Sequence, residues 1–160
     1  MNTLLDVKNL NVTFEFNEQK VEAVRGSSFT INKGECLAIV GESGSGKSVT
    51  ALTIMRLIRS NSQLKISGKA IYENKNLLNL DESTLQNIRG KKISMIFQEP
   101  MTSLNPLMTI GKQISEVLDR HFKLSKKETY QKAKNILDIV QIPDSKRWLN
   151  GYPHEMSGGM

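Results

Sequence analysis

The feature that most constrains this chain is a glycine-rich segment, GESGSGKS, at residues 41–48. A short apolar run, ECLAIV, precedes it at residues 35–40, and apolar residues at helical spacing follow it over residues 47–59. A short apolar run bounded by turn signals is typical of a strand buried on both faces, whereas the spacing after the loop predicts an amphipathic helix. The sequence therefore predicts a strand, a glycine loop and a helix, in that order.

This order suits a site for a polyphosphate. Consecutive backbone N–H groups in a glycine-rich turn bind an anion, and the following helix adds the positive end of its dipole. Gly41, Gly44 and Gly46 allow the backbone to turn where a Cβ would clash or where φ must be positive. Lys47 can reach the β- and γ-phosphates, and the Ser48 hydroxyl can bind Mg²⁺. The spacing G-x-x-x-x-G-K-[S/T] thus predicts a P-loop that binds a nucleotide, with a plain flexible turn as the alternative reading.

Composition and charge exclude several other classes of protein. With 38% hydrophobic and 24% charged residues, the 160-residue chain is expected to form one well-cored domain, with at most a small appendage. Its single cysteine excludes an internal disulfide framework and fits a reducing, cytoplasmic setting. Its longest apolar run, residues 36–40, is far shorter than the roughly 20 residues of a membrane-spanning helix, and the N-terminus lacks the pattern of a secretory signal.

The formal net charge of +6 raises the question of a nucleic-acid partner. The basic residues are spread along the chain and mixed with acids, as in DRHFKLSKKETYQKAKN at residues 119–135, with few aromatic residues between them. This pattern is more typical of a solvated helix face. We therefore expect no nucleic-acid partner.

Further patterns predict the elements around the loop. Residues 4–31 show β-rich alternation interrupted by a polar NEQK turn, which indicates antiparallel strands. Residues 64–80 read as another β segment with a turn at ENKN, and Asp81 would cap a short helix that Gly90 ends. The run KISMIF at residues 92–97 predicts a second buried strand.

The hydrophobic period changes to that of helices after Thr109. One apolar helix face begins at Ile110, Ser125 and Glu128 form a capping box for the next helix, and Pro143 is expected to stop that helix. We therefore expect a nucleotide-binding core over residues 1–108, and a helical subdomain over residues 109–160 whose helices reach to about residue 150.

A P-loop alone does not distinguish kinases, GTPases, helicases and transport ATPases. A GTPase would need a guanine-selective N-K-x-D, whereas ENKNLL contains only N-K-N-L. Two other strings, QEPMTSLNP at residues 98–106 and YPHEMSGGM at residues 152–160, narrow the choice. Together with GESGSGKSVT they resemble the ATP-binding subunits of ABC importers for oligopeptides, dipeptides and nickel, and the resemblance runs from residue 4 to residue 160. It implies an α/β P-loop NTPase fold with an N-terminal antiparallel β subdomain, a helical subdomain and an incomplete core sheet.

The resemblance also implies roles for individual residues. Phe16 would stack on adenine, with Phe14 as a competitor and an inward-packed strand residue as the alternative reading. FQEP resembles the Q-loop of the family, in which Gln98 would approach Mg²⁺ and the attacking water as the catalytic residue of this chain. The nucleotide-binding residues of the loop itself would be Gly41, Ser43, Gly44, Ser45, Gly46, Lys47, Ser48 and Val49. Ser48 and Gln98 would bind the Mg²⁺ ion.

The SGG string at Ser157, Gly158 and Gly159 resembles the signature motif of ABC ATPases. Its hydroxyl and its backbone N–H groups, at the start of a helix, would contact the γ-phosphate bound to a second ATPase subunit. Two residues depart from the common pattern: Val49 stands where many P-loops have a threonine, and Met160 replaces the usual glutamine.

The family places a strand ending in Asp-Glu and a switch histidine after the signature, and residues 1–160 contain no counterpart of either. We therefore expect this chain to be part of a longer protein, to expose sheet edges and apolar faces, and to show little steady ATP hydrolysis by itself. His121 and His154 read as structural or surface residues.

The resemblance implies ATP and Mg²⁺ as ligands and a position at the cytoplasmic face of the cell membrane. The implied partners are a second ATPase subunit, transmembrane permease subunits and, indirectly, an extracytoplasmic solute-binding protein. Two alternatives stay open: a nucleotide-binding chain without turnover, and a soluble ABC protein that acts in translation or DNA repair.

Overall fold

The computed structural model describes the chain over residues 2–16, 19–58, 63–98 and 103–160. The chain folds as two compact units, which comprise residues 1–89 and 90–160. The domain boundary that the sequence predicts after residue 108 stays a prediction for the whole protein.

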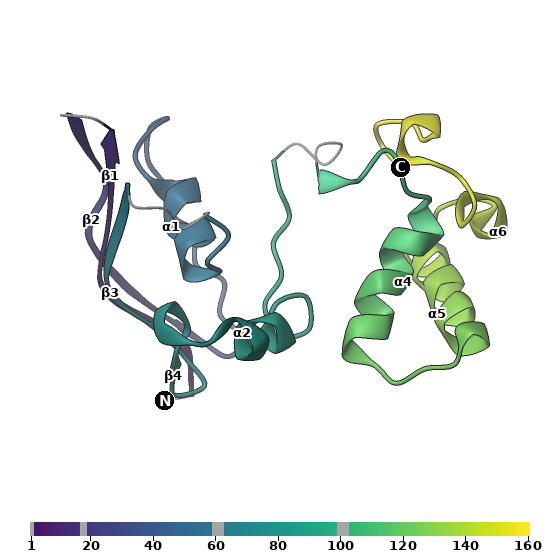
Figure 1. Ribbon diagram of the computed structural model, residues 1–160, viewed down its shortest axis with the longest axis horizontal. Coiled ribbons are helices and arrows are strands. Elements are labelled where there is room, and N and C mark those ends of the chain that lie inside the picture. Colours follow the sequence, from purple (N-terminus) through teal and green to yellow (C-terminus); the bar gives the residue numbers. More distant parts are fainter. Residues whose placement is uncertain (1, 17–18, 59–62, 99–102) are drawn as a thin grey trace. The chain divides into compact units, whose positions relative to one another are not determined.

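The first unit is built on an antiparallel sheet with the strand order β2-β1-β3-β4 (Figure 1). Its strands are β1 (Thr3–Phe16), β2 (Gln19–Asn32), β3 (Leu64–Tyr72) and β4 (Lys75–Asn76). The antiparallel strands predicted in residues 4–31 are confirmed, and so is the β segment with its ENKN turn as far as Asn76. The rest of the predicted segment is not a strand, because Leu77–Asn79 form a 3-10 turn.

The central strand β1 is the most buried part of this sheet. Val7, Leu10 and Val12 are almost fully buried, as expected of a strand paired on both sides. The register between β1 and β3 shifts after Lys8, opposite Gly68. A Cβ on Gly68 would lie 2.3 Å from the carbonyl oxygen of Asn9, so only glycine fits this irregularity.

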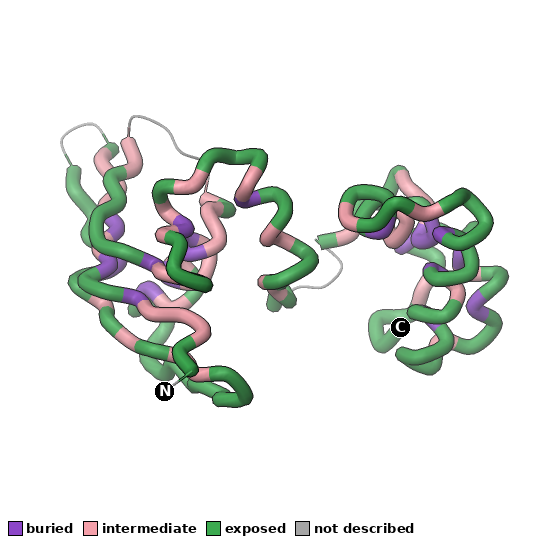
Figure 2. The backbone as a smooth tube through the Cα atoms, turned by 90° about the horizontal axis from the view of Figure 1, so that it is seen from below, coloured by how far each residue is buried: buried purple, intermediate pink, exposed green. Residues whose placement is uncertain are grey.

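One face of the sheet contacts helix α1 (Lys47–Ile54), which packs against β1, β2 and the 3-10 turn η1 (Leu77–Asn79). The buried residues of α1 are Thr50, Thr53 and Ile54, and Thr53 is fully buried; Figure 2 colours the buried residues of the backbone purple. The helix is shorter than the predicted span of residues 47–59. It ends at Ile54 because the residues after it close a C-terminal turn, in which the N–H of Leu57 donates to the carbonyl of Leu52.

The two predicted buried strands, residues 35–40 and 92–97, are not strands in this structure. Val40 is 88% exposed and Ile96 is 95% exposed. A strand is stabilised by hydrogen bonds to a neighbouring strand, and these two runs have no such neighbour in the described part of the chain. Their exposure confirms the expectation of open apolar faces and an incomplete core sheet.

The second unit is helical. It contains α4 (Ile110–His121), α5 (Lys126–Ile139), the short α6 (Ser145–Trp148) and the 3-10 turn η2 (Pro153–Glu155). Its core consists of Ile110, Leu118, Ala133, Leu137 and Leu149. No helix in the described ranges is both long and apolar enough to cross a membrane.

Both predicted helices of this unit are confirmed, and so is the capping box in which Ser125 and Glu128 exchange hydrogen bonds. However, α5 ends at Ile139 rather than at Pro143. Gln141 adopts a left-handed conformation with φ 60°, and the N–H of Ile142 donates to the carbonyl of Leu137. A C-terminal turn therefore stops this helix before proline is reached.

Candidate functional site

The phosphate loop, residues 41–48, connects the exposed run 35–40 to helix α1. Gly44 and Gly46 have φ values of 82° and 88°, in the left-handed region. Side chains rarely adopt this conformation, so the loop needs glycine at both positions. The loop thus has the backbone path expected of a turn that presents N–H groups to an anion.

Gly46 is also required by close packing. A Cβ at this position would lie 2.2 Å from the carbonyl oxygen of Ala23 on β2. Gly46 caps helix α1, and no side chain caps its first N–H groups. The open, positive end of α1 is therefore held directly against the sheet, and its N–H groups are free of a competing side-chain acceptor.

The amine of Lys47 lies inside the curve of the loop. Its Nζ donates to the carbonyl oxygens of Gly41 and Glu42, at 2.7 and 2.6 Å, and to Ser45 Oγ at 3.3 Å. Ser48 follows it at the start of α1. An ammonium group inside the loop and a hydroxyl at the helix start have the chemistry that a metal-bound polyphosphate needs. The residues of the phosphate loop therefore fit Mg²⁺ and a nucleotide.

Phe16 lies at the end of β1 and is 50% exposed. Its ring stacks on that of Phe14, with 6.2 Å between the centroids and 8° between the planes. The inward-packed reading of Phe16 is wrong, because the residue is half exposed. Its assignment to adenine stays a prediction.

Gln98 and the signature turn, residues 157–159, belong to the second unit. Gln98 is exposed and follows the unpaired run 92–97. Ser157 and the two glycines form an exposed turn in which the N–H of Met160 donates to the Ser157 carbonyl, and the expectation that they lie at a helix start stays a prediction. Within each unit, the described geometry thus brings together the residues of the phosphate loop alone.

The two histidines also belong to the second unit. His154 is exposed and stacks on Tyr152, and His121 lies at the end of α4. Within the described ranges, no group of three or more His, Cys, Asp or Glu side chains is placed to hold a metal. A cavity of about 690 Å³ in the helical unit contains none of the predicted site residues.

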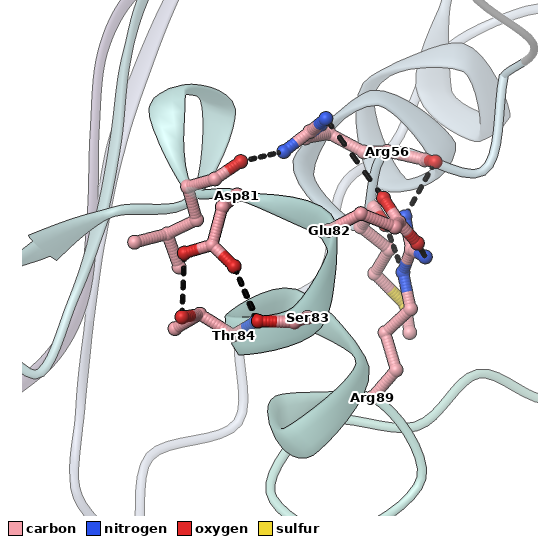
Figure 3. A network of polar contacts seen from close by, with 8 residues as sticks. Arg56, Asp81, Glu82, Ser83, Thr84 and Arg89 are labelled. Carbon is pink, nitrogen blue, oxygen red and sulfur yellow. Dashed lines mark hydrogen bonds and ion pairs between the residues drawn. The ribbon is translucent and has the colours of Figure 1, made fainter.

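The C-terminal end of α1 is held by side chains that the sequence did not point to (Figure 3). Arg89 donates from Nε to the carbonyl of Met55 at 2.8 Å and from Nη2 to the carbonyl of Arg56 at 2.7 Å. Its Nη1 pairs with Glu82 at 2.7 Å. Arg56 in turn donates to the carbonyl of Leu80 and lies 3.9 Å from Glu82. We call Arg56, Glu82 and Arg89 the arginine network.

The network is attached to helix α2 (Glu82–Ile88), whose first turn Asp81 caps as predicted. The Asp81 carboxylate accepts from the Ser83 hydroxyl at 2.6 Å, and from the Thr84 hydroxyl and N–H at 2.6 and 2.9 Å. These hydrogen bonds hold the pKa of Asp81 well below its ordinary value. The cap therefore stays ionised at a lower pH than an ordinary aspartate does.

The model of the ABC transporter family matches residues 24–160. An oligopeptide transport ATP-binding protein of Bacillus subtilis is 51% identical over 98% of this chain and 44% of its own length. A second such protein, from Haemophilus influenzae, is 50% identical over 100% of this chain and 49% of its own length. The chain spans about half the length of the curated relatives it matches.

Solved structures agree with this match. The dimeric structure of a bacterial ABC transporter cassette superposes with a TM-score of 0.81 and 28% identity, over 98% of this chain and 64% of that one. A dimeric cassette described as a post-hydrolysis state bound to ADP and phosphate gives a TM-score of 0.79 at 26% identity, with the same coverage. The chain therefore has the fold of an ABC-type P-loop NTPase and belongs to the ABC transporter family.

Proposed function

We propose that the chain is the nucleotide-binding part of a subunit that powers peptide import by an ABC transporter, through ATP binding and hydrolysis. The observation that carries the proposal is the phosphate loop: Lys47 lies inside the loop, and Gly46 fixes the start of α1 against β2. The names of the relatives, which refer to oligopeptide and dipeptide transport, favour peptides over nickel as the solute.

In this proposal the loop N–H groups and Lys47 bind the β- and γ-phosphates of ATP. The Ser48 hydroxyl and Gln98 contribute to a Mg²⁺ site, and Phe16 stacks on adenine. ATP hydrolysis is a proposal for the whole protein, and this chain by itself binds ATP with little turnover. The rival reading, a nucleotide-binding chain without turnover in any assembly, differs from ours only in that last step.

Ser157, Gly158 and Gly159 would meet the γ-phosphate bound to a second ATPase subunit. Two observations support this role: the turn is exposed, and a Cβ on either glycine would meet no atom within 4 Å in this chain. The matching cassettes are described as dimers. The remaining proposed partners are transmembrane permease subunits at the cytoplasmic face of the membrane, with a solute-binding protein acting indirectly.

Titration of the chain with ATP and Mg²⁺ in a calorimeter tests the proposal. We expect saturable binding to one site per chain. Lys47→Ala should lower the affinity for ATP by about 100-fold or more, because a charged contact with the phosphates is removed. The matched control is Lys8→Ala, which removes an exposed ion pair to Asp6 on β1 and leaves the loop intact. Absence of ATP binding to a folded wild-type chain, or equal binding by Lys47→Ala, would contradict the proposal.

A further inference from the structure

The arginine network contacts the end of α1 that lies opposite the phosphate loop. Helix α1 has eight residues, which corresponds to a length of about 12 Å. So short a helix moves as one body, and the direction of its first N–H groups depends on how its last turn is held. At its start, Gly46 lies so close to Ala23 on β2 that a Cβ would not fit between them.

Arg89 uses all three of its guanidinium nitrogens in this network. Two of them donate to the carbonyls of Met55 and Arg56, which are left open at the end of α1, and the third pairs with Glu82. A cation at a helix C-terminus also interacts favourably with the dipole. The side chain is only 22% exposed, so its contacts are less screened by water than those of a surface pair.

The backbone that Arg89 holds is in an uncommon conformation. Arg56 has φ 51°, in the left-handed region where helix ends usually have glycine. Its own N–H donates to the Thr53 carbonyl and completes the turn that ends the helix. The side-chain contacts of Arg56 to Leu80 and Glu82 hold this conformation from the other side. The end of α1 is therefore held in place by α2 and the segment before it.

We propose that Arg89 is a positioning residue for nucleotide binding, which acts through the C-terminal end of α1 to orient the phosphate loop at its other end. The inference rests on the proposed function of that loop. Arg89 does not itself contact the ligand. It is the last residue of the first unit, so the same side chain also fixes the point at which the chain leaves that unit.

The test compares the binding of ATP and AMP with stability. We expect Arg89→Ala to lower ATP affinity by about tenfold, because charged hydrogen bonds that align the loop are lost. AMP makes no β- or γ-phosphate contact, so its affinity should change much less. Arg89→Lys keeps the cation but not the planar group that reaches three partners, and should restore only part of the ATP affinity. Affinities are corrected to the folded fraction, measured by urea unfolding of each variant.

Two controls separate the possible results. Glu82→Gln removes the ion pairs of Glu82 with Arg89 and Arg56 but leaves both carbonyl contacts of Arg89. Its ATP affinity should lie between those of the wild type and Arg89→Ala. Lys8→Ala should change neither affinity. Equal loss of ATP and AMP binding, or loss of stability with unchanged ATP affinity of the folded protein, would overturn the inference by giving Arg89 a merely structural role. Failure of the wild-type chain to bind ATP would instead contradict the proposed function.

Discussion

The phosphate loop and the signature turn are both rich in glycine, but their glycines have different surroundings. A Cβ on Gly46 would collide with the backbone of β2, and Gly44 and Gly46 have positive φ. Gly158 and Gly159 have no positive φ, and a Cβ added to either would have no atom within 4 Å. The first set of glycines is therefore required by the chain's own fold. Nothing in the described part of residues 1–160 requires the second set, because an added Cβ would meet only open space there.

The largest expected effect is that of Gly46→Ala. The added Cβ forces apart α1 and β2, and the new residue must also adopt a left-handed conformation, so we expect a loss of about 3 kcal/mol or more in the free energy of unfolding. Urea unfolding followed by circular dichroism measures this loss. Gly34→Ala is the matched control, because Gly34 has φ 77° but nothing within 4 Å of the added carbon. Equal losses in the two variants would show that the contact with Ala23 is unimportant.

Gly41→Ala tests a contact that can relax. Its Cβ would lie 2.6 Å from Ser45 Oγ, a side-chain atom that is able to move. We expect a smaller loss, about 1 kcal/mol, together with weaker ATP binding because Ser45 leaves the Lys47 amine. In the double variant with Ser45→Gly the stability cost of Gly41→Ala should largely disappear, as a double-mutant cycle would measure. A cost that persists would place the strain elsewhere in the loop.

The segment around α2 supports α1, and its local stability is expected to depend on pH. The pKa of Asp81 is lowered in the folded state, so its contribution to stability is present above the ordinary carboxyl pKa and is lost as pH falls through the folded pKa. We expect the protection factors of the amides at the start of α2, that is, their exchange rates relative to those of an unfolded peptide at the same pH, to fall below about pH 4, and Asp81→Asn to weaken this dependence. Hydrogen exchange between about pH 6 and about pH 3 provides the measurement. If the pH dependence of exchange is unchanged in Asp81→Asn, Asp81 is not its cause.

The smallest effect is expected in the signature turn. Gly158→Ala and Gly159→Ala should change the free energy of unfolding by less than about 0.5 kcal/mol and leave the ATP affinity of the chain unchanged. If the proposed dimer forms, the same substitutions should slow ATP-dependent association of intact subunits, as analytical ultracentrifugation would detect. A large loss of stability in either variant would show that the fold needs the glycines of the signature turn as much as those of the phosphate loop.

The sequence predicts well those features that depend on neighbouring residues. The caps formed by Asp81 and by Ser125 with Glu128, and the antiparallel strands on either side of the NEQK turn, follow from short-range spacing and are confirmed. The runs 35–40 and 92–97 have equally clear strand patterns. They do not form strands, because a strand also needs a partner, and no local pattern reports whether a partner is present.

The arginine network was not predictable for a related reason. Arg89 is separated from Met55 and Arg56 by 34 and 33 positions in the sequence. In the string NIRGKK it resembles any surface charge, and only the packing of α2 beside the end of α1 gives it a role. The site could therefore be predicted as far as its motif extends, but not the side chains that hold the motif in position.

The hydrogen bonds of Lys47 have a consequence for how selective the loop is. Since the amine already donates to two carbonyl oxygens, an arriving anion gains only the difference between its own attraction and that of these internal acceptors. A singly charged oxyanion offers little more than the carbonyls do, whereas a polyphosphate offers several concentrated charges. These internal hydrogen bonds therefore compete with an incoming anion for the Lys47 amine, and we expect the competition to weaken the binding of a singly charged oxyanion such as acetate more than that of a polyphosphate.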